Sequence, residues 1–123
     1  MIGGVIEVKL KNKKVAMLVA EQYQDLEVWY PLLRLKEEGA KIVVVGTGSA
    51  PEYKGKFGYP IKVDTTADKI KAKDFDAVVI PGGWAPDFLR RYPAVCKFVA
   101  DMDKQKKIIA AICHAGSVLV SAG

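Results

Sequence analysis

A thiol and an imidazole are adjacent near the end of this 123-residue chain, in the stretch AAICHAGSV at residues 110–118. Cys113 is one of two cysteines, and His114 is the only histidine. A thiolate is a strong nucleophile, and imidazole is the side chain best suited to moving protons at neutral pH. The pair therefore has the chemistry of a cysteine-dependent enzyme, although a free cysteine is also a common small core residue.

The residues around this cysteine are small. Ala111, Ala115 and Gly116 flank it, in the order small-x-nucleophile-x-small. This pattern is typical of a tight turn from a strand into a helix, which lifts the nucleophile out at the carboxyl end of the strand. We expect Gly116 to relieve crowding in the first helical turn. N–H groups at the start of that helix favour the thiolate form of Cys113.

The elements that must position this pair alternate along the chain. Apolar runs of strand length predict strands at 15–20, 42–45, 77–80 and 108–112, with a short extra strand at 61–63 and an added edge strand at 5–10. Helical spacing and end signals predict helices at 25–39, near 67–70, at 93–104 and from about 114, and a loop at 46–58. We expect Asp25 to cap the first of these helices and Pro31 to kink or offset it. Such alternation predicts a parallel sheet with helices on both faces.

Unusual residues follow three of the predicted strands. They are Glu21–Glu27 after the first, Pro81-Gly82-Gly83 after the third long strand and Cys113-His114 after the last. Sites in open α/β sheets form at the carboxyl ends of strands, so these segments should meet. The N–H groups of Gly83 and His114 are candidates for the two halves of an oxyanion hole. A carboxyl group near Cys113 would complete the set.

Composition excludes several other functions. The net charge is +5, but the lysines are scattered rather than gathered with aromatic residues, which disfavours nucleic-acid binding. Gly46-Thr-Gly48 is followed by Pro51 and lacks a dinucleotide fingerprint, and one histidine with Cys96 and Cys113 makes no standard zinc site. We therefore expect no cofactor and no metal. The apolar runs are too short to span a membrane, so we expect a cytoplasmic protein with reduced cysteines.

Five segments together resemble the PfpI intracellular protease family, within the wider ThiJ group that includes the parkinsonism-associated deglycase. They are Asp25–Pro31 (DLEVWYP), 35–39 (LKEEG), 55–58 (GKFG), 80–86 (IPGGWAP) and 111–114 (AICH). The resemblance implies a flavodoxin-like three-layer α/β/α sandwich with a mainly parallel sheet over residues 14–123, after an extension at 1–13. Family members continue beyond the point matching Gly123 with further strands and a helix, so we expect the family fold to be incomplete here.

The resemblance also implies roles for individual residues. Cys113 corresponds to the nucleophile, Glu27 to the carboxyl beside the sulfur, and His114 to the base of the protease branch. Asp87 corresponds to an acid that orients the histidine from a neighbouring subunit, and Gln24 replaces a family carboxylate. Gly82, Trp84, Tyr23 and Tyr30 would lie at the pocket or its entrance. Simpler interpretations stay open: Glu27 as an exposed first-turn residue, Asp87 as the cap of a helix from Phe88, and the aromatic side chains as plain packing.

The leading functional hypothesis is a cysteine-dependent hydrolase using Cys113. Its substrates would be peptides or amides, or else early glycation adducts and small dicarbonyls. The alternatives are a redox-responsive stress protein or chaperone-like scaffold, in which Cys113 oxidises instead of turning over substrate, and an inactive fragment. We expect a homo-oligomer (dimer or hexamer) or association with a complementary C-terminal segment, and no nucleic-acid or membrane partner.

Overall fold

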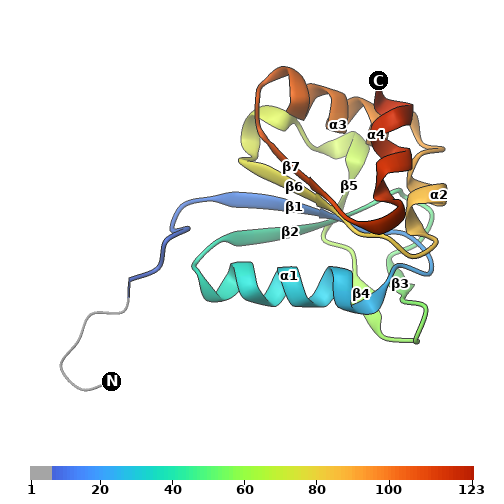
Figure 1. Ribbon diagram of the computed structural model, residues 1–123, viewed down its shortest axis with the longest axis horizontal. Helices are drawn as coiled ribbons and strands as arrows, with labels where there is room; N and C mark the ends of the chain where they lie inside the picture. Colours follow the sequence, from blue (N-terminus) through green and yellow to red (C-terminus); the bar gives the residue numbers. More distant parts are fainter. Residues whose placement is uncertain (1–6) are drawn as a thin grey trace.

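The computed structural model of the protein describes residues 7–123 and contains a five-stranded parallel sheet in the order β5-β2-β1-β6-β7 (Figure 1). The strands are β1 (Lys14–Leu18), β2 (Lys41–Gly46), β5 (Thr65–Thr66), β6 (Ala77–Ile80) and β7 (Ile108–Ala111). A separate antiparallel hairpin pairs β3 (Glu52–Lys54) with β4 (Pro60–Lys62). The prediction of a mainly parallel sheet is confirmed.

Helices cover both faces of the sheet. Helix α1 (Asp25–Glu37) lies on one face, and α3 (Pro93–Lys104) and α4 (Gly116–Ala122) lie on the other (Figure 1). The short helix α2 (Ala85–Leu89) follows β6, and three single 3₁₀ turns complete the set: η1 (Ala67–Lys69), η2 (Ala72–Asp74) and η3 (Cys113–Ala115). The result is the three-layer α/β/α arrangement expected of a flavodoxin-like fold.

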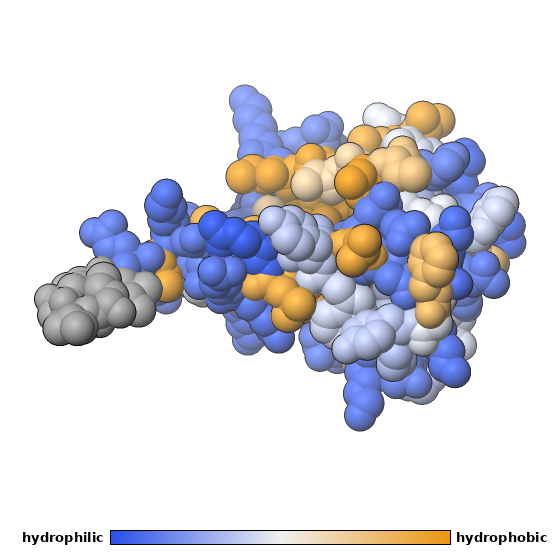
Figure 2. Space-filling view, turned by 60° about the horizontal axis from the view of Figure 1, so that its bottom comes forward, coloured by the Kyte–Doolittle hydropathy of each residue, from blue (hydrophilic) through white to orange (hydrophobic). Residues whose placement is uncertain are grey.

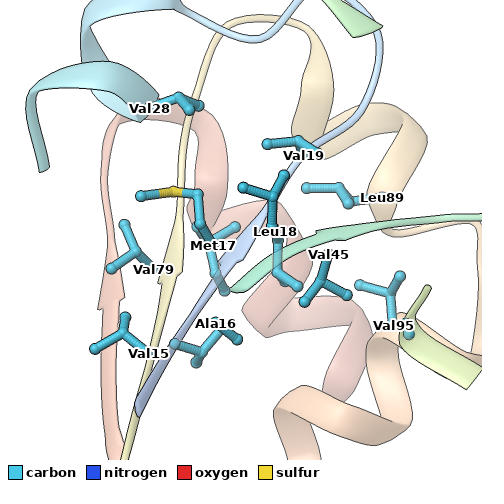
Figure 3. Packing of buried hydrophobic residues seen from close by; sticks show 14 of the residues in the cluster. Val15, Ala16, Met17, Leu18, Val19, Val28, Val45, Val79, Leu89 and Val95 are labelled. Carbon is cyan, nitrogen blue, oxygen red and sulfur yellow. The ribbon is translucent and has the colours of Figure 1, made fainter. Parts of the chain in front are cut away.

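The core is centred on β1, which has a strand on each side. Met17 and Leu18 are completely buried, as are Val19 and Ala20 just beyond the strand. Figure 3 shows Val28 and Val79 near one side of this segment, and Val45, Leu89 and Val95 near the other. Burying an aliphatic side chain of this size contributes about 1.5–3 kcal/mol, so this strand is the main anchor of the sheet. It fixes the carboxyl strand ends where the candidate residues lie.

The start of α1 differs from the prediction. Helix α1 begins at Asp25 itself, so Asp25 is not the cap, and the residue before it, Gln24, makes no capping side-chain bond. The Asp25 carboxylate instead accepts the N–H groups of Phe57 (3.0 Å) and Tyr59 (3.1 Å), which come from the loop joining β3 to β4. Asp25 therefore ties that loop to the helix.

Two other predictions were wrong, and the kink expected at Pro31 stays a prediction. Helix α1 runs without a break from Asp25 to Glu37, and Pro31 is the seventh of its thirteen residues. The expected loop at 46–58 contains β3, whose central residue Tyr53 is buried. Of the edge strand expected at 5–10, residues 5 and 6 lie outside the described residues, and residues 7–10 form no strand; Leu10 N–H instead donates to the Glu38 carbonyl.

Candidate active site

The topology brings the predicted segments to one edge of the sheet. Strand β6 ends at Pro81-Gly82-Gly83, β7 leads into Cys113, and the segment after β1 leads into the first turn of α1, which carries Glu27. Since these strands are parallel neighbours, their carboxyl ends lie together. The sheet itself thus assembles the site from residues far apart in the sequence.

Cys113 lies in the tight turn that the small flanking residues predict. Its φ is +60°, a left-handed conformation that is unfavourable for a residue with a Cβ atom. Its side chain is exposed, and Sγ lies 3.2 Å from Nδ1 of His114. Ala115 is completely buried beneath the turn and donates its N–H to Ile112. This backbone holds a thiol in solvent and within hydrogen-bonding distance of an imidazole.

Gly116 has open space around it on the side away from its own helix. A Cβ atom built there meets nothing within 4 Å among residues 7–123 outside that helix's backbone, so no packing against another element requires glycine. The close approach occurs instead at Ala115, whose buried methyl group already fills the space between the turn and the core.

Glu27 faces the same glycine as the thiol. It is half-buried, and its Oε1 accepts the Gly82 N–H at 2.8 Å. A Cβ atom on Gly82 would lie 2.5 Å from Glu27 Oε1 and 3.2 Å from Cys113 Sγ. The carboxyl oxygen of Glu27 and the sulfur of Cys113 therefore both lie close to the Cα atom of Gly82. Glu27 is therefore not a solvated first-turn residue: Gly82 N–H holds its carboxyl group, and the side chain of Cys113 lies next to the same glycine.

Two backbone N–H groups near the thiol are available as donors. An isolated bridge pairs Tyr23 with Gly83, through hydrogen bonds from Gln24 N–H to Gly82 and from Trp84 N–H to Gln22. This pairing leaves the N–H of Gly83, at φ +73°, with no acceptor among residues 7–123, and the same holds for His114 N–H. Donors of this kind stabilise an oxyanion without reorganisation.

A pocket of about 370 Å³ surrounds these groups. Its lining includes six of the residues singled out from the sequence: Glu27, Gly83, Trp84, Asp87, Cys113 and His114. Gln24, where the family carboxylate is replaced, also lines it. The remaining lining residues were missed by sequence reasoning; they are Lys56, Pro86, Arg90 and Ser117. Lys56 lies within the GKFG segment of the family resemblance, and this segment is the feature of the sequence that could have indicated a role for Lys56.

Two expected residues, Tyr23 and Tyr30, lie outside the lining of this pocket, whereas Asp87 lines it and has an ion-pair partner of its own. Tyr23, expected at the entrance, is completely buried in the core; it donates to the Tyr59 carbonyl and accepts from Trp29, and burial raises its pKa above the ordinary value. Tyr30 is exposed and, together with Glu27, lines the groove beside α1 instead of the pocket around Cys113. Asp87 lies inside α2 and not at its cap, because the helix already begins at Ala85. Its carboxylate pairs with Arg91 at 2.6 Å and makes no bond to His114 within the described chain.

The Gly82→Ala change is expected to disrupt this site. The new methyl carbon would lie 2.5 Å from Glu27 Oε1 and 2.6 Å from Cys113 Cβ, so one of these side chains must move. We expect a loss of about 1–3 kcal/mol in the free energy of unfolding and roughly 100-fold slower turnover. Gly116→Ala is the matched control and should leave both nearly unchanged, because its methyl group meets only open space. Thermal unfolding and steady-state rates of Gly82→Ala and Gly116→Ala measure these losses. If the two variants lose the same stability and the same rate, the close approach at Gly82 does not matter and the described geometry is contradicted.

The described residues hold no group of three or more histidine, cysteine, aspartate or glutamate side chains arranged to bind a metal ion. None of the helices in this part of the chain is both long and apolar enough to cross a membrane.

Comparisons with known proteins place the fold and the site in a family context. The chain is 41% identical over 110 residues to Deglycase PH1704 from Pyrococcus horikoshii, covering 89% of this chain and 66% of the relative. It is 34% identical over 112 residues to General stress protein 18 from Bacillus subtilis, covering 90% of this chain and 65% of that protein. The chain thus spans about two thirds of the length of these curated relatives.

A solved structure agrees with the architecture. A two-domain protein from Anabaena variabilis, with DJ-1/ThiJ/PfpI-like and ferritin-like domains, superposes with a TM-score of 0.88 and 42% sequence identity, covering 90% of this chain and 32% of that one. The DJ-1/PfpI family itself matches residues 13–123. The chain therefore belongs to the DJ-1/PfpI family.

Proposed function

We propose that this protein is a cysteine-dependent hydrolase in which Cys113 attacks the carbonyl carbon of its substrate. The observation that supports the proposal is the position of the Cys113 sulfur atom relative to an imidazole and a carboxyl group. Cys113 Sγ is exposed in a left-handed turn, 3.2 Å from the His114 imidazole, in a pocket that also holds the Glu27 carboxyl group. Nucleophile and base within hydrogen-bonding reach are the signature of covalent catalysis.

The proposed reaction begins with proton transfer from the thiol to His114 Nδ1. The sulfur then bonds to the carbonyl carbon, and the C=O π electrons move to oxygen. Gly83 and His114 N–H groups would donate to this oxyanion. With an amide substrate, collapse restores the carbonyl and breaks the bond to the leaving amine, which takes a proton from His114 or Glu27. Water then attacks the resulting thioester and returns the free thiol and a carboxylic acid.

Glu27 has a distinct part in this scheme. Gly82 N–H occupies one oxygen of its carboxyl group, which leaves the other available to exchange a proton with the sulfur or the leaving group. A half-buried carboxyl group held by a backbone donor keeps one orientation through the reaction. We therefore assign proton transfer at the leaving group to Glu27 and activation of the thiol to His114.

The substrate class follows from the relatives. PH1704 is named a deglycase, and we propose that this chain likewise acts on early carbonyl adducts of amines. A methylglyoxal adduct is a hemiaminal: its amine leaves as the hydroxyl-bearing carbon becomes an aldehyde carbonyl, and the Cys113 sulfur bonds to that carbonyl carbon to give a hemithioacetal. Glu27 then moves the C–H proton of this carbon to the neighbouring ketone carbon, which gives a thioester that water hydrolyses to lactate and the free thiol. The competing hypothesis, a redox-responsive protein, draws on the exposure of Cys113 and on the stress-protein relative. Incubation with methylglyoxal-modified Nα-acetyl-lysine separates the two, because a hydrolase releases free Nα-acetyl-lysine catalytically. Sulfinic acid at Cys113 after mild peroxide, without such release, would contradict the hydrolase proposal.

Two substitutions at Glu27 test its assigned role. Glu27→Gln keeps an oxygen for the Gly82 N–H but cannot transfer a proton, so we expect turnover to fall by about 10²–10⁴ with folding intact. Glu27→Leu also leaves the Gly82 donor without its acceptor, and should cost a further ~1–3 kcal/mol of stability. Rates and thermal midpoints measured together check this. If Glu27→Gln turns over at the wild-type rate, Glu27 is not the proton donor.

A further inference from the structure

Two cationic side chains line the pocket around Cys113. Lys56 comes from the loop between β3 and β4, and Arg90 follows the end of α2. They belong to segments that are far apart in the sequence, and both segments contribute to the lining of this pocket. The acidic residues of the same lining are Glu27 and Asp87.

Neither acid neutralises these cations. Asp87 is paired with Arg91, and Glu27 accepts the Gly82 N–H. Arg90 donates its Nε to the uncharged Ser121 hydroxyl at 2.9 Å, and neither Arg90 nor Lys56 forms an ion pair within residues 7–123. The pocket therefore presents two cations that have no carboxylate partner of their own.

The backbone at both positions is well anchored. Lys56 N–H donates to the Tyr23 carbonyl at 2.9 Å, and Asp25 accepts N–H groups from the next residues of the same loop. Arg90 N–H donates to the Pro86 carbonyl at 3.0 Å, while Ser121 holds the guanidinium from the side of α4. Guanidinium and ammonium groups form their strongest hydrogen bonds with carboxylate oxygens, and prior anchoring reduces the entropy lost on binding.

We propose that Lys56 and Arg90 bind a carboxylate of the substrate while Cys113 attacks its carbonyl carbon. This inference rests on the proposed function and narrows its substrates to carbonyl adducts that carry a free carboxylate, such as adducts on free amino acids. An adduct within a protein chain has its backbone carboxyl groups in amide bonds and lacks that group. The pocket is thus selective for small anionic substrates over neutral ones of the same shape.

Alkylation of Cys113 tests the charge selectivity without any turnover. Iodoacetate carries a carboxylate and iodoacetamide is its neutral counterpart, and peptide mass spectrometry gives the rate at Cys113 for each reagent. We expect Lys56→Gln and Arg90→Gln each to lower the ratio of the iodoacetate rate to the iodoacetamide rate about fivefold; a change in the thiolate fraction affects both reagents alike and cancels in this ratio. Lys54→Gln removes the same charge from an exposed position in the same hairpin, outside the pocket lining, and should change neither rate. If all three variants give the wild-type ratio of the two rates, the inference is overturned.

A turnover experiment separates this inference from the proposed function. Methylglyoxal adducts of Nα-acetyl-lysine and of its C-terminal amide differ only in the carboxylate. We expect a kcat/KM about 5–25-fold higher for the acid, lost in the Lys56→Gln/Arg90→Gln double variant mainly through KM. Equal kcat/KM values for acid and amide overturn the inference and leave the hydrolase proposal standing. If neither adduct is turned over, the hydrolase proposal fails, and the iodoacetate ratio still decides whether the pocket selects anions.

Discussion

Replacing Cys113 with serine is expected to lower turnover of carbonyl adducts by at least about 10³-fold, because a neutral hydroxyl is a far weaker nucleophile than a thiolate. The change should leave the fold intact. Cys113 is exposed, and its backbone conformation is set by the turn between β7 and η3 rather than by packing of the sulfur. Steady-state rates with methylglyoxal-modified Nα-acetyl-lysine, together with thermal unfolding, measure both effects.

Cys96→Ser is the matched control for this experiment. Cys96 lies in α3, and its thiol donates to the Arg90 carbonyl at 3.4 Å, a bond that a serine hydroxyl can replace. We therefore expect Cys96→Ser to keep nearly the full rate. Wild-type rates in Cys113→Ser, or an equal loss in both variants, would contradict the assignment of the nucleophile.

The second large effect concerns an uncovered part of the sheet. Helix α1 packs over β2, and beside it the sheet face toward β7 forms a groove of about 770 Å³ with a mainly apolar lining. Figure 2 shows a patch of hydrophobic side chains among hydrophilic ones in the upper part of the face toward the viewer. Ile108 and Ile112, which line the groove, are 68% and 48% exposed. Within the described residues, β7 pairs only with β6, so its outer edge is open.

We propose that a second copy of the chain covers this edge. Strand β7 reads Ile-Ile-Ala-Ala, with no charge or proline to prevent pairing with another strand, and such edges associate readily. We expect the 123-residue polypeptide to be oligomeric at micromolar concentration in light scattering. Burying an isoleucine contributes about 1.5–3 kcal/mol, so Ile108→Lys should shift the protein strongly toward the monomer. Thr66→Lys, on the strand at the other end of the sheet, is the control and should leave the oligomer unchanged.

Two results would contradict this proposal. One is a wild-type chain that is monomeric and unfolds cooperatively at the same concentration. The other is an oligomer unaffected by Ile108→Lys, which would place the interface elsewhere. Loss of the oligomer on adding a peptide segment that binds the groove would show that a complementary segment, rather than a second copy, covers this face.

The order of strands and helices could be predicted because burial dictates sequence in this fold. Residues 15–20 and 77–80 are uninterrupted apolar runs, since β1 and β6 lie inside the sheet with a strand on each side and nearly all their side chains are buried. Strand β3 escaped prediction for the opposite reason: Glu52 and Lys54 point to solvent, and only Tyr53 is buried. The Asp25 error has a similar origin, because its partners come from a loop more than thirty residues away.

The residues of the candidate site also fall into two groups, those that the sequence predicts and those that only the tertiary fold brings to the pocket. Cys113, His114 and the two glycines could be found from local spacing, because a tight turn and strand ends impose small residues nearby in the sequence. Glu27 needed the family resemblance, since a carboxylate in a first helical turn is common on any surface helix. Lys56 and Arg90 could not be distinguished from other surface cations, because only the tertiary fold brings them to the pocket. Gly116 has no neighbour from another element among residues 7–123, so the crowding expected within the helical turn stays a prediction.

A single measurement tests most directly whether Cys113 forms a bond to a carbonyl carbon. Rapid mixing of the protein with p-nitrophenyl acetate, followed by acid quenching and peptide mass spectrometry, identifies any acyl group transferred within the first turnover. The account predicts a burst of one nitrophenolate per active site, with the acetyl group on the peptide that contains Cys113, and no burst in Cys113→Ser. Acetyl groups found only on lysines, or an equal burst in Cys113→Ser, would contradict it.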